Sequence, residues 1–196
     1  MRATGTARPS GAGSMSERTP LLILGLGNIL CTDDGVGAVA VHRLLREYDA
    51  PAEAQVLDGG TLGLSLLPLL EEADAAILVD AIRGEGPAGT LVRIEGEEVA
   101  PAVAARLSVH QVGVADLLDG ARLLGRCPPR LVLVGIVPAD LGLGIALSPV
   151  VAAGLPRLVA AVVEEARALG FPFQPREADA QDPVRDADGV ALALRL

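Results

Sequence analysis

The chain has 196 residues, of which 51% are hydrophobic, and this is enough apolar sequence for one domain with a full core. A net charge of -9 and an aromatic content of 2% oppose binding to nucleic acid, which requires cations for the phosphates and rings for base stacking. The same charge opposes binding to an anionic membrane. All basic residues are arginines, which excludes chemistry that requires a lysine, such as a Schiff base or a P-loop.

The two ends of the chain have the composition of tails. Residues 1–19 are rich in Gly, Ser, Thr and Arg and lack the apolar stretch of a signal peptide, which predicts a disordered tail on a cytoplasmic protein. Residues 171–196 are rich in Asp and Pro and predict a loosely ordered acidic tail. Residues 20–170 are expected to form a single α/β domain. Met15 offers an alternative start, because the fold signal begins only near Pro20.

The first element combines an apolar run, a glycine turn, two acids and a helical pattern. Residues 21–24 (LLIL) predict a buried strand, which residues 25–28 (GLGN) end. Asp33 or Asp34 is expected to cap the helix that follows. The glycines do not form a dinucleotide fingerprint, because Leu30 takes the place of the third glycine and two carboxylates would repel a phosphate.

Strands and helices alternate along the rest of the chain, which predicts an α/β fold with helices on both faces of the sheet. The loop at residues 83–89 is short enough for a hairpin, so the strand after it is expected to be antiparallel to its neighbour. Ser148 is expected to cap the last helix, Gly170 to end it and Pro156 to kink or break it. Residues 95–107 have no clear pattern. The other predicted strands are residues 54–57, 75–79, 90–94 and 131–136, and the predicted helices are residues 61–70, 112–124 and 148–169. Thr61 is a candidate cap for the helix at residues 61–70.

Three polar residues, Asp34, Asp80 and His110, stand where predicted strands end or a predicted helix begins. In a doubly wound sheet they lie at one edge, and two carboxylates with an imidazole suit a divalent ion such as Ni²⁺, Zn²⁺ or Mn²⁺. A purely structural role is equally compatible with the pattern: Asp34 as a helix cap, Asp80 in a loop and His110 packed at a helix start. The second histidine, His42, is expected to be solvated beside two arginines.

Nucleophiles are poorly represented. Ser65 lacks the closing glycine of G-x-S-x-G. Cys31 has His110 as a candidate partner but no local protease signature. Cys31 and Cys127 form no C-x-x-C pair, and both are expected to be small buried apolar residues.

Several blocks of sequence follow one another in a specific order. They are GLGNILCTDDGVG at residues 25–37, DGGT at 58–61, VDA at 79–81, SVHQ at 108–111 and LVGIVP at 133–138. Together these blocks resemble the maturation endopeptidases of [NiFe] hydrogenases, and the resemblance covers about residues 21–169.

The resemblance implies a three-layer α/β/α fold with a mixed, mostly parallel five-stranded sheet and one antiparallel strand. It implies an endopeptidase that removes the C-terminal extension of a hydrogenase large-subunit precursor after nickel insertion. The metal-contacting and catalytic residues of the family carry over to Asp34, Asp80 and His110. The family has Glu or Asp at the first position, and this chain has the shorter Asp. The expected cofactor is nickel carried by the substrate, with no resident organic cofactor, and the oligomeric state stays open.

The resemblance also suggests a mechanism, in which these three residues complete the coordination of nickel held by the substrate's thiolates. An empty precursor would lack this anchor, so cleavage would check metal insertion. Two other classes stay open. A peptidase with its own resident ion would bind metal tightly in isolation. A non-catalytic metal sensor or carrier would bind the loaded precursor and release it uncut.

Overall fold

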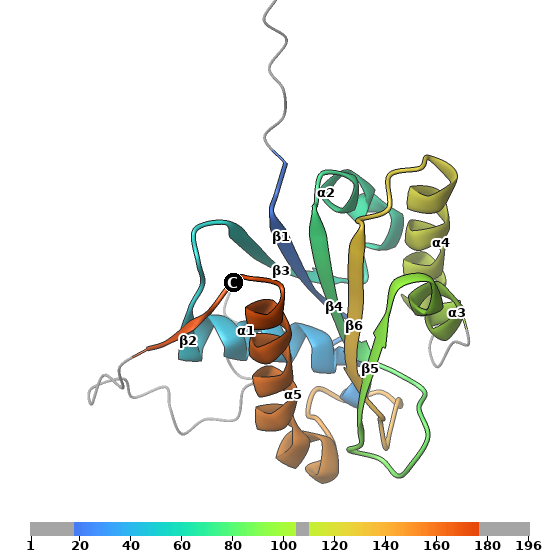
Figure 1. The fold of residues 1–196 in the computed structure, drawn as a ribbon. Helices are drawn as coiled ribbons and strands as arrows, with labels where there is room; N and C mark the ends of the chain where they lie inside the picture. Colours follow the sequence, from blue (N-terminus) through green and yellow to red (C-terminus); the bar gives the residue numbers. More distant parts are fainter. Residues whose placement is uncertain (1–17, 105–109, 177–196) are drawn as a thin grey trace, which may run out of the picture.

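A five-stranded sheet runs through the middle of the molecule (Figure 1). Its strands are β1 (Leu21–Leu26), β3 (Ala54–Gly60), β4 (Ala75–Ala81), β5 (Leu91–Glu95) and β6 (Arg130–Ile136). The computed structural model describes residues 18–104 and 110–176, without the side chains of residues 110–112. The strand order is β3-β1-β4-β6-β5, with β5 antiparallel to β6 and all other pairs parallel. The prediction of a mixed, mostly parallel sheet with one antiparallel strand is confirmed.

Helices cover both faces of the sheet and make three layers (Figure 1). The helices are α1 (Val36–Glu47), α2 (Leu67–Glu71), α3 (Val99–Ala104), α4 (His110–Leu123) and α5 (Pro149–Ala168). α1 and α5 pack on one face and α2, α3 and α4 on the other, each over its own apolar core. Successive strand residues point to opposite faces, so Ile23 joins the first core and Leu24 the second. Strands buried on both faces explain the continuous apolar runs in the sequence.

The antiparallel strand β5 has a different partner from the one that a hairpin would give it. It follows β4 in sequence but pairs with β6, which lies between them, with Leu91 opposite Ile136. The loop after β4 therefore passes the end of β6 and does not close a hairpin. The reason is that β6 is almost entirely apolar and can be buried in the interior of the sheet. β5 carries the exposed side chains of Arg93 and Glu95, so it lies at the edge of the sheet, where these side chains reach solvent.

Two predictions about helix starts are wrong. α1 is preceded by a short 3-10 helix, η1 (Thr32–Gly35), and its N-cap is Gly35 with no side-chain hydrogen bond, so neither aspartate caps it. Thr61 caps nothing, because residues 61–70 form a turn followed by the 3-10 helix η2 (Gly63–Leu66) and then α2.

α5 begins and ends as predicted but does not break at Pro156. Ser148 is its N-cap, with the Oγ atom accepting a hydrogen bond of 3.5 Å from Val151 N, and Gly170 follows it with a φ of 98°. The helix continues through Pro156, which is exposed, as is Ala152. Pro156 has no N–H group to donate to the carbonyl of Ala152, four residues earlier. Because both residues are exposed, this carbonyl can accept a hydrogen bond from water instead.

The packed structure continues past residue 170, the expected end of the domain. Phe173 is only 6% exposed and belongs to the core under α1 and α5. Beside it, β7 (Gln174–Pro175) pairs with β2 (Tyr48–Asp49). The tails were predicted at residues 1–19 and 171–196, and residues 1–17 and 177–196 of them lie outside the described residues. None of the described helices is both long enough and apolar enough to cross a membrane.

Candidate functional site

The carboxyl ends of the parallel strands meet at the lower edge of the sheet in Figure 1, where the loops after β1, β4 and β6 gather. Asp34 lies in η1, soon after β1, and Asp80 is the next-to-last residue of β4. Their exposed fractions are only 2% and 1%. Aspartates are rarely so deeply buried, because an ionised carboxylate is costly to remove from water. Their burial makes this edge the candidate site.

A close backbone contact brings the loop of Asp34 to the end of β4. Gly37 lies three residues after Asp34, and a Cβ atom there would be 2.1 Å from the carbonyl oxygen of Val79. Val79 directly precedes Asp80, so only a glycine at position 37 lets α1 approach the strand end this closely. Gly37, the last glycine of the first sequence block, therefore has a structural role. It lets the loop of Asp34 lie against the end of β4, which carries Asp80.

The side chain of Asp80 points to the face of the sheet that α4 covers. Ala76 and Leu78, which alternate in the same phase along β4, belong to the core on that face. The backbone of α4 begins at His110.

The first turn of α4 packs against η2, which follows the carboxyl end of β3. A Cβ atom on Gly63 would lie 2.9 Å from Gly113 Cα. The start of α4 therefore lies at the same edge as the two buried acids. The side chain of His110 lies outside the described part of the chain, so its place in the site stays a prediction.

Two carboxylates and an imidazole have the donor chemistry that suits Ni²⁺, and Asp34 and Asp80 supply the carboxylates at this edge. Among the side chains that the structure describes, which do not include that of His110, no three of His, Cys, Asp or Glu lie close enough together to hold a metal ion. The assignment of Asp34, Asp80 and His110 as catalytic and metal-contacting residues stays a prediction.

Asp33 has a role that the sequence did not reveal. Its carboxylate is fully buried, at 0% exposure, and accepts four hydrogen bonds from the segment after β6. Oδ2 accepts from Ala139 N at 2.8 Å, Asp140 N at 3.0 Å and Ser148 Oγ at 2.8 Å, and Oδ1 accepts from Ser148 N at 2.7 Å. These donors lie 106 to 115 residues further along the chain, so no local pattern signals them.

His42 is exposed, as predicted, and it is also paired. Its Nε2 lies 2.9 Å from Oδ2 of Asp58, and this hydrogen bond raises the pKa of His42. Asp58 Oδ1 accepts from Gly60 N at 2.9 Å, so the carboxylate of Asp58 joins α1 to the end of β3.

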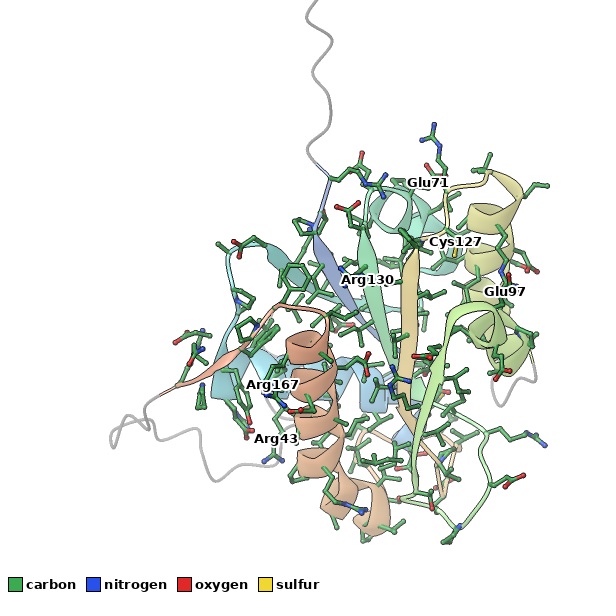
Figure 2. The ribbon with its side chains drawn as sticks, in the orientation of Figure 1. Arg43, Glu71, Glu97, Cys127, Arg130 and Arg167 are labelled. Carbon is green, nitrogen blue, oxygen red and sulfur yellow. The ribbon has the colours of Figure 1, made fainter. Side chains whose placement is uncertain are left out.

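The two cysteines differ in position. Cys127 lies near the amino end of β6, at the opposite end of the sheet from the candidate site (Figure 2). Burial raises the pKa of its thiol, which keeps it protonated and unreactive. Cys31 is partly buried in the loop before η1. Neither is fully buried, contrary to the prediction.

The family of the chain follows from comparison with known proteins. A family model described as hydrogenase maturation protease matches residues 39–165. The chain belongs to this family. The matched residues include Asp80 and His110 and begin after Asp34. The resemblance seen in the sequence is thus confirmed, and the protein is a hydrogenase maturation protease.

Individual relatives extend the match of this maturation protease to most of its length. The hydrogenase expression/formation protein HupD of Rhodobacter capsulatus is 41% identical over 153 residues, which are 77% of this chain and 73% of the relative. The hydrogenase 2 maturation protease of Escherichia coli K12 is 38% identical over 159 residues, 81% of this chain and 97% of the relative. The solved structure of the hydrogenase maturating endopeptidase HybD from E. coli superposes on this chain with a TM-score of 0.76 at 36% sequence identity. The superposition includes 80% of this chain and 98% of the HybD chain.

Proposed function

We propose that this maturation protease removes the C-terminal extension of a [NiFe] hydrogenase large-subunit precursor once nickel has been inserted. Asp34, Asp80 and His110 would contact the nickel that the substrate carries. The observation that carries the proposal is the burial of Asp34 and Asp80 at the carboxyl edge of the sheet, in a member of a hydrogenase maturation family.

The chemistry of the two acids supports recognition of a substrate-borne cation. Buried carboxylates carry a desolvation cost, which a cation that arrives with the substrate offsets. Carboxylate oxygens and an imidazole are suitable ligands for Ni²⁺. A precursor without nickel offers the acids no such partner and would bind weakly. Substrate nickel, when present, can also polarise a carbonyl or activate a water molecule.

The two histidines of the chain provide a matched pair of variants that tests the site. We expect His110→Ala to slow the cleavage of a nickel-loaded precursor by at least about a hundredfold, as loss of a group that acts at the reaction centre does. His42→Ala, at the exposed histidine outside the candidate site, is expected to cleave at the rate of the unmodified protein. The C-terminal mass of the precursor and the urea unfolding midpoint of each variant are the measurements. Normal processing by a folded His110→Ala protein would remove His110 from the site.

A further inference from the structure

The loop after β6, residues 137–148, is docked along the residues that lead to Asp34. Gly144 N donates to Leu30 O at 3.0 Å, and Thr32 N donates to Gly144 O at 2.8 Å, as in a short parallel ladder. The hydroxyl of Thr32 donates to Asp140 O at 2.6 Å. The loop therefore forms a wall directly beside the candidate site, and it lies at the lower edge of the molecule in Figure 1.

The buried carboxylate of Asp33 fixes this wall at two places. It accepts from Ala139 N and Asp140 N near the start of the loop and from both polar groups of Ser148 at its end. Since Asp33 is adjacent to Asp34 in η1, its carboxylate, together with the hydrogen bonds of Leu30, Thr32 and Gly144, sets the position of the wall relative to Asp34.

The wall presents apolar side chains to solvent. Leu143 is 90% exposed and Ile145 is 54% exposed, and they flank Gly144, whose backbone pairs with the chain on either side of Cys31. Leu30, 53% exposed, precedes Cys31 and so lies beside them. We call Leu30, Leu143 and Ile145 the apolar shelf. A cluster of exposed aliphatic side chains next to a buried acidic site is typical of a binding surface.

We propose that the apolar shelf binds an apolar stretch of the substrate polypeptide next to the scissile bond, and that Asp33 is the positioning residue that holds the shelf in place. This inference rests on the proposed function. An extended peptide offers alternate side chains to shallow apolar surfaces, and three aliphatic residues match a few residues of such a chain. A second copy of the protein is a poor fit, because stable interfaces use about 20 residues a side. Asp140, exposed on the same loop, disfavours an acidic stretch.

The shelf is tested with the double variant Leu143→Ser, Ile145→Ser in the full chain, with nickel-loaded large-subunit precursor as the probe. We expect KM to rise about tenfold with kcat unchanged, because the lost contacts lie beside the reacting bond and not at it. Leu123→Ser is the matched control, since Leu123 is 88% exposed at the far end of α4 and is expected to leave both constants unchanged.

The outcomes separate the shelf from the proposed function. If the unmodified protein does not cleave the loaded precursor, the proposed function fails. If it cleaves and the double variant has the same KM, only the shelf fails. A dimer of the unmodified protein that the double substitution converts to monomers, measured by sedimentation, would also overturn the proposal. So would a lower KM for a chain that ends at residue 176, because its own C-terminal segment would then be the occupant.

The role of Asp33 is tested by Asp33→Asn, with Asp119→Asn on the exposed side of α4 as the control. We expect KM for the loaded precursor to rise at least about tenfold, because an amide nitrogen cannot accept the donors that hold the wall. Ser148→Ala removes one of the four hydrogen bonds and is expected to raise KM by a smaller factor, which keeps the test valid if Asp33→Asn does not fold. Unchanged KM values in folded variants would show that Asp33 does not position the shelf.

Discussion

Asp33 and Asp34 are adjacent in sequence and equally buried, yet their carboxylates have different surroundings. Asp33 accepts four hydrogen bonds from residues 139–148, which accounts for its buried charge as a structural group. Asp34 Oδ2 accepts a longer hydrogen bond of 3.2 Å from Asn28 N, in the glycine turn after β1. The acidic pair of the first sequence block therefore combines a structural carboxylate with a candidate catalytic one.

The pair of His42 and Asp58 gives a prediction of pH dependence. Because the pKa of His42 is raised in the folded state, its protonated form stabilises the fold. This contribution is complete below the unfolded value of about 6.5 and is lost as the pH rises through the folded pKa. The side chains are 46% and 36% exposed, so we expect no more than about 0.5 kcal/mol.

The measurement is urea unfolding of the unmodified protein and of His42→Gln at low salt, at about pH 5.5 and about pH 9. The unmodified protein should be the more stable of the two at the lower pH, and the difference should shrink at the higher pH. An equal difference at both values would show that protonation of His42 does not contribute to stability.

At the scale of elements, a close contact between two glycines sets how near the start of α4 lies to η2. A Cβ atom on Gly113 would lie 3.1 Å from Gly63 Cα, which is too close for the two backbones to remain where they are. Gly120, two turns later in the same helix, would place a Cβ atom at an ordinary distance of 3.4 Å from the flexible side chain of Leu64.

These two glycines predict opposite results for the same substitution. Gly120→Ala should raise the free energy of unfolding by up to about 1 kcal/mol, because alanine is the better helix former. Gly113→Ala should lower it by about 1 kcal/mol and reduce cleavage, because the start of α4, which carries His110, must shift. Urea unfolding and the cleavage assay measure both. Equal stability and activity for the two variants would contradict a tight contact between α4 and η2.

Strands and helices could be predicted where the local sequence pattern determines them. Which strands pair with each other could not be predicted in this way. The buried strands of the sheet were found because short apolar runs bounded by polar residues, glycine or proline have few alternatives. The pairing of β5 with β6 leaves no local trace, since it is decided by which strand can be buried on both faces. η1 in place of an aspartate cap has a similar cause, because hydrogen bonds from residues 139–148 compete for Asp33.

At the scale of the whole molecule, the chain collects loops from β1, β4 and β6 at one sheet edge, and the buried acids lie there. The positions of Asp34 and Asp80 after predicted strands placed both at one sheet edge, where the structure also has them, while their metal-contacting role stays a prediction. The sequence did not identify the apolar shelf, because Leu30 and Leu143 are distant in sequence and only the docking of residues 137–148 brings them together.

Recognition of nickel on the substrate can be measured by comparing loaded and empty precursor. The full chain is incubated with large-subunit precursor prepared with and without inserted nickel, and the mass of the precursor's C-terminus is followed with time. We expect loss of the extension from the nickel-loaded precursor and an intact C-terminus in the nickel-free one. Equal cleavage of both forms would contradict nickel recognition by Asp34, Asp80 and His110, and an uncut loaded precursor would contradict the proposed substrate.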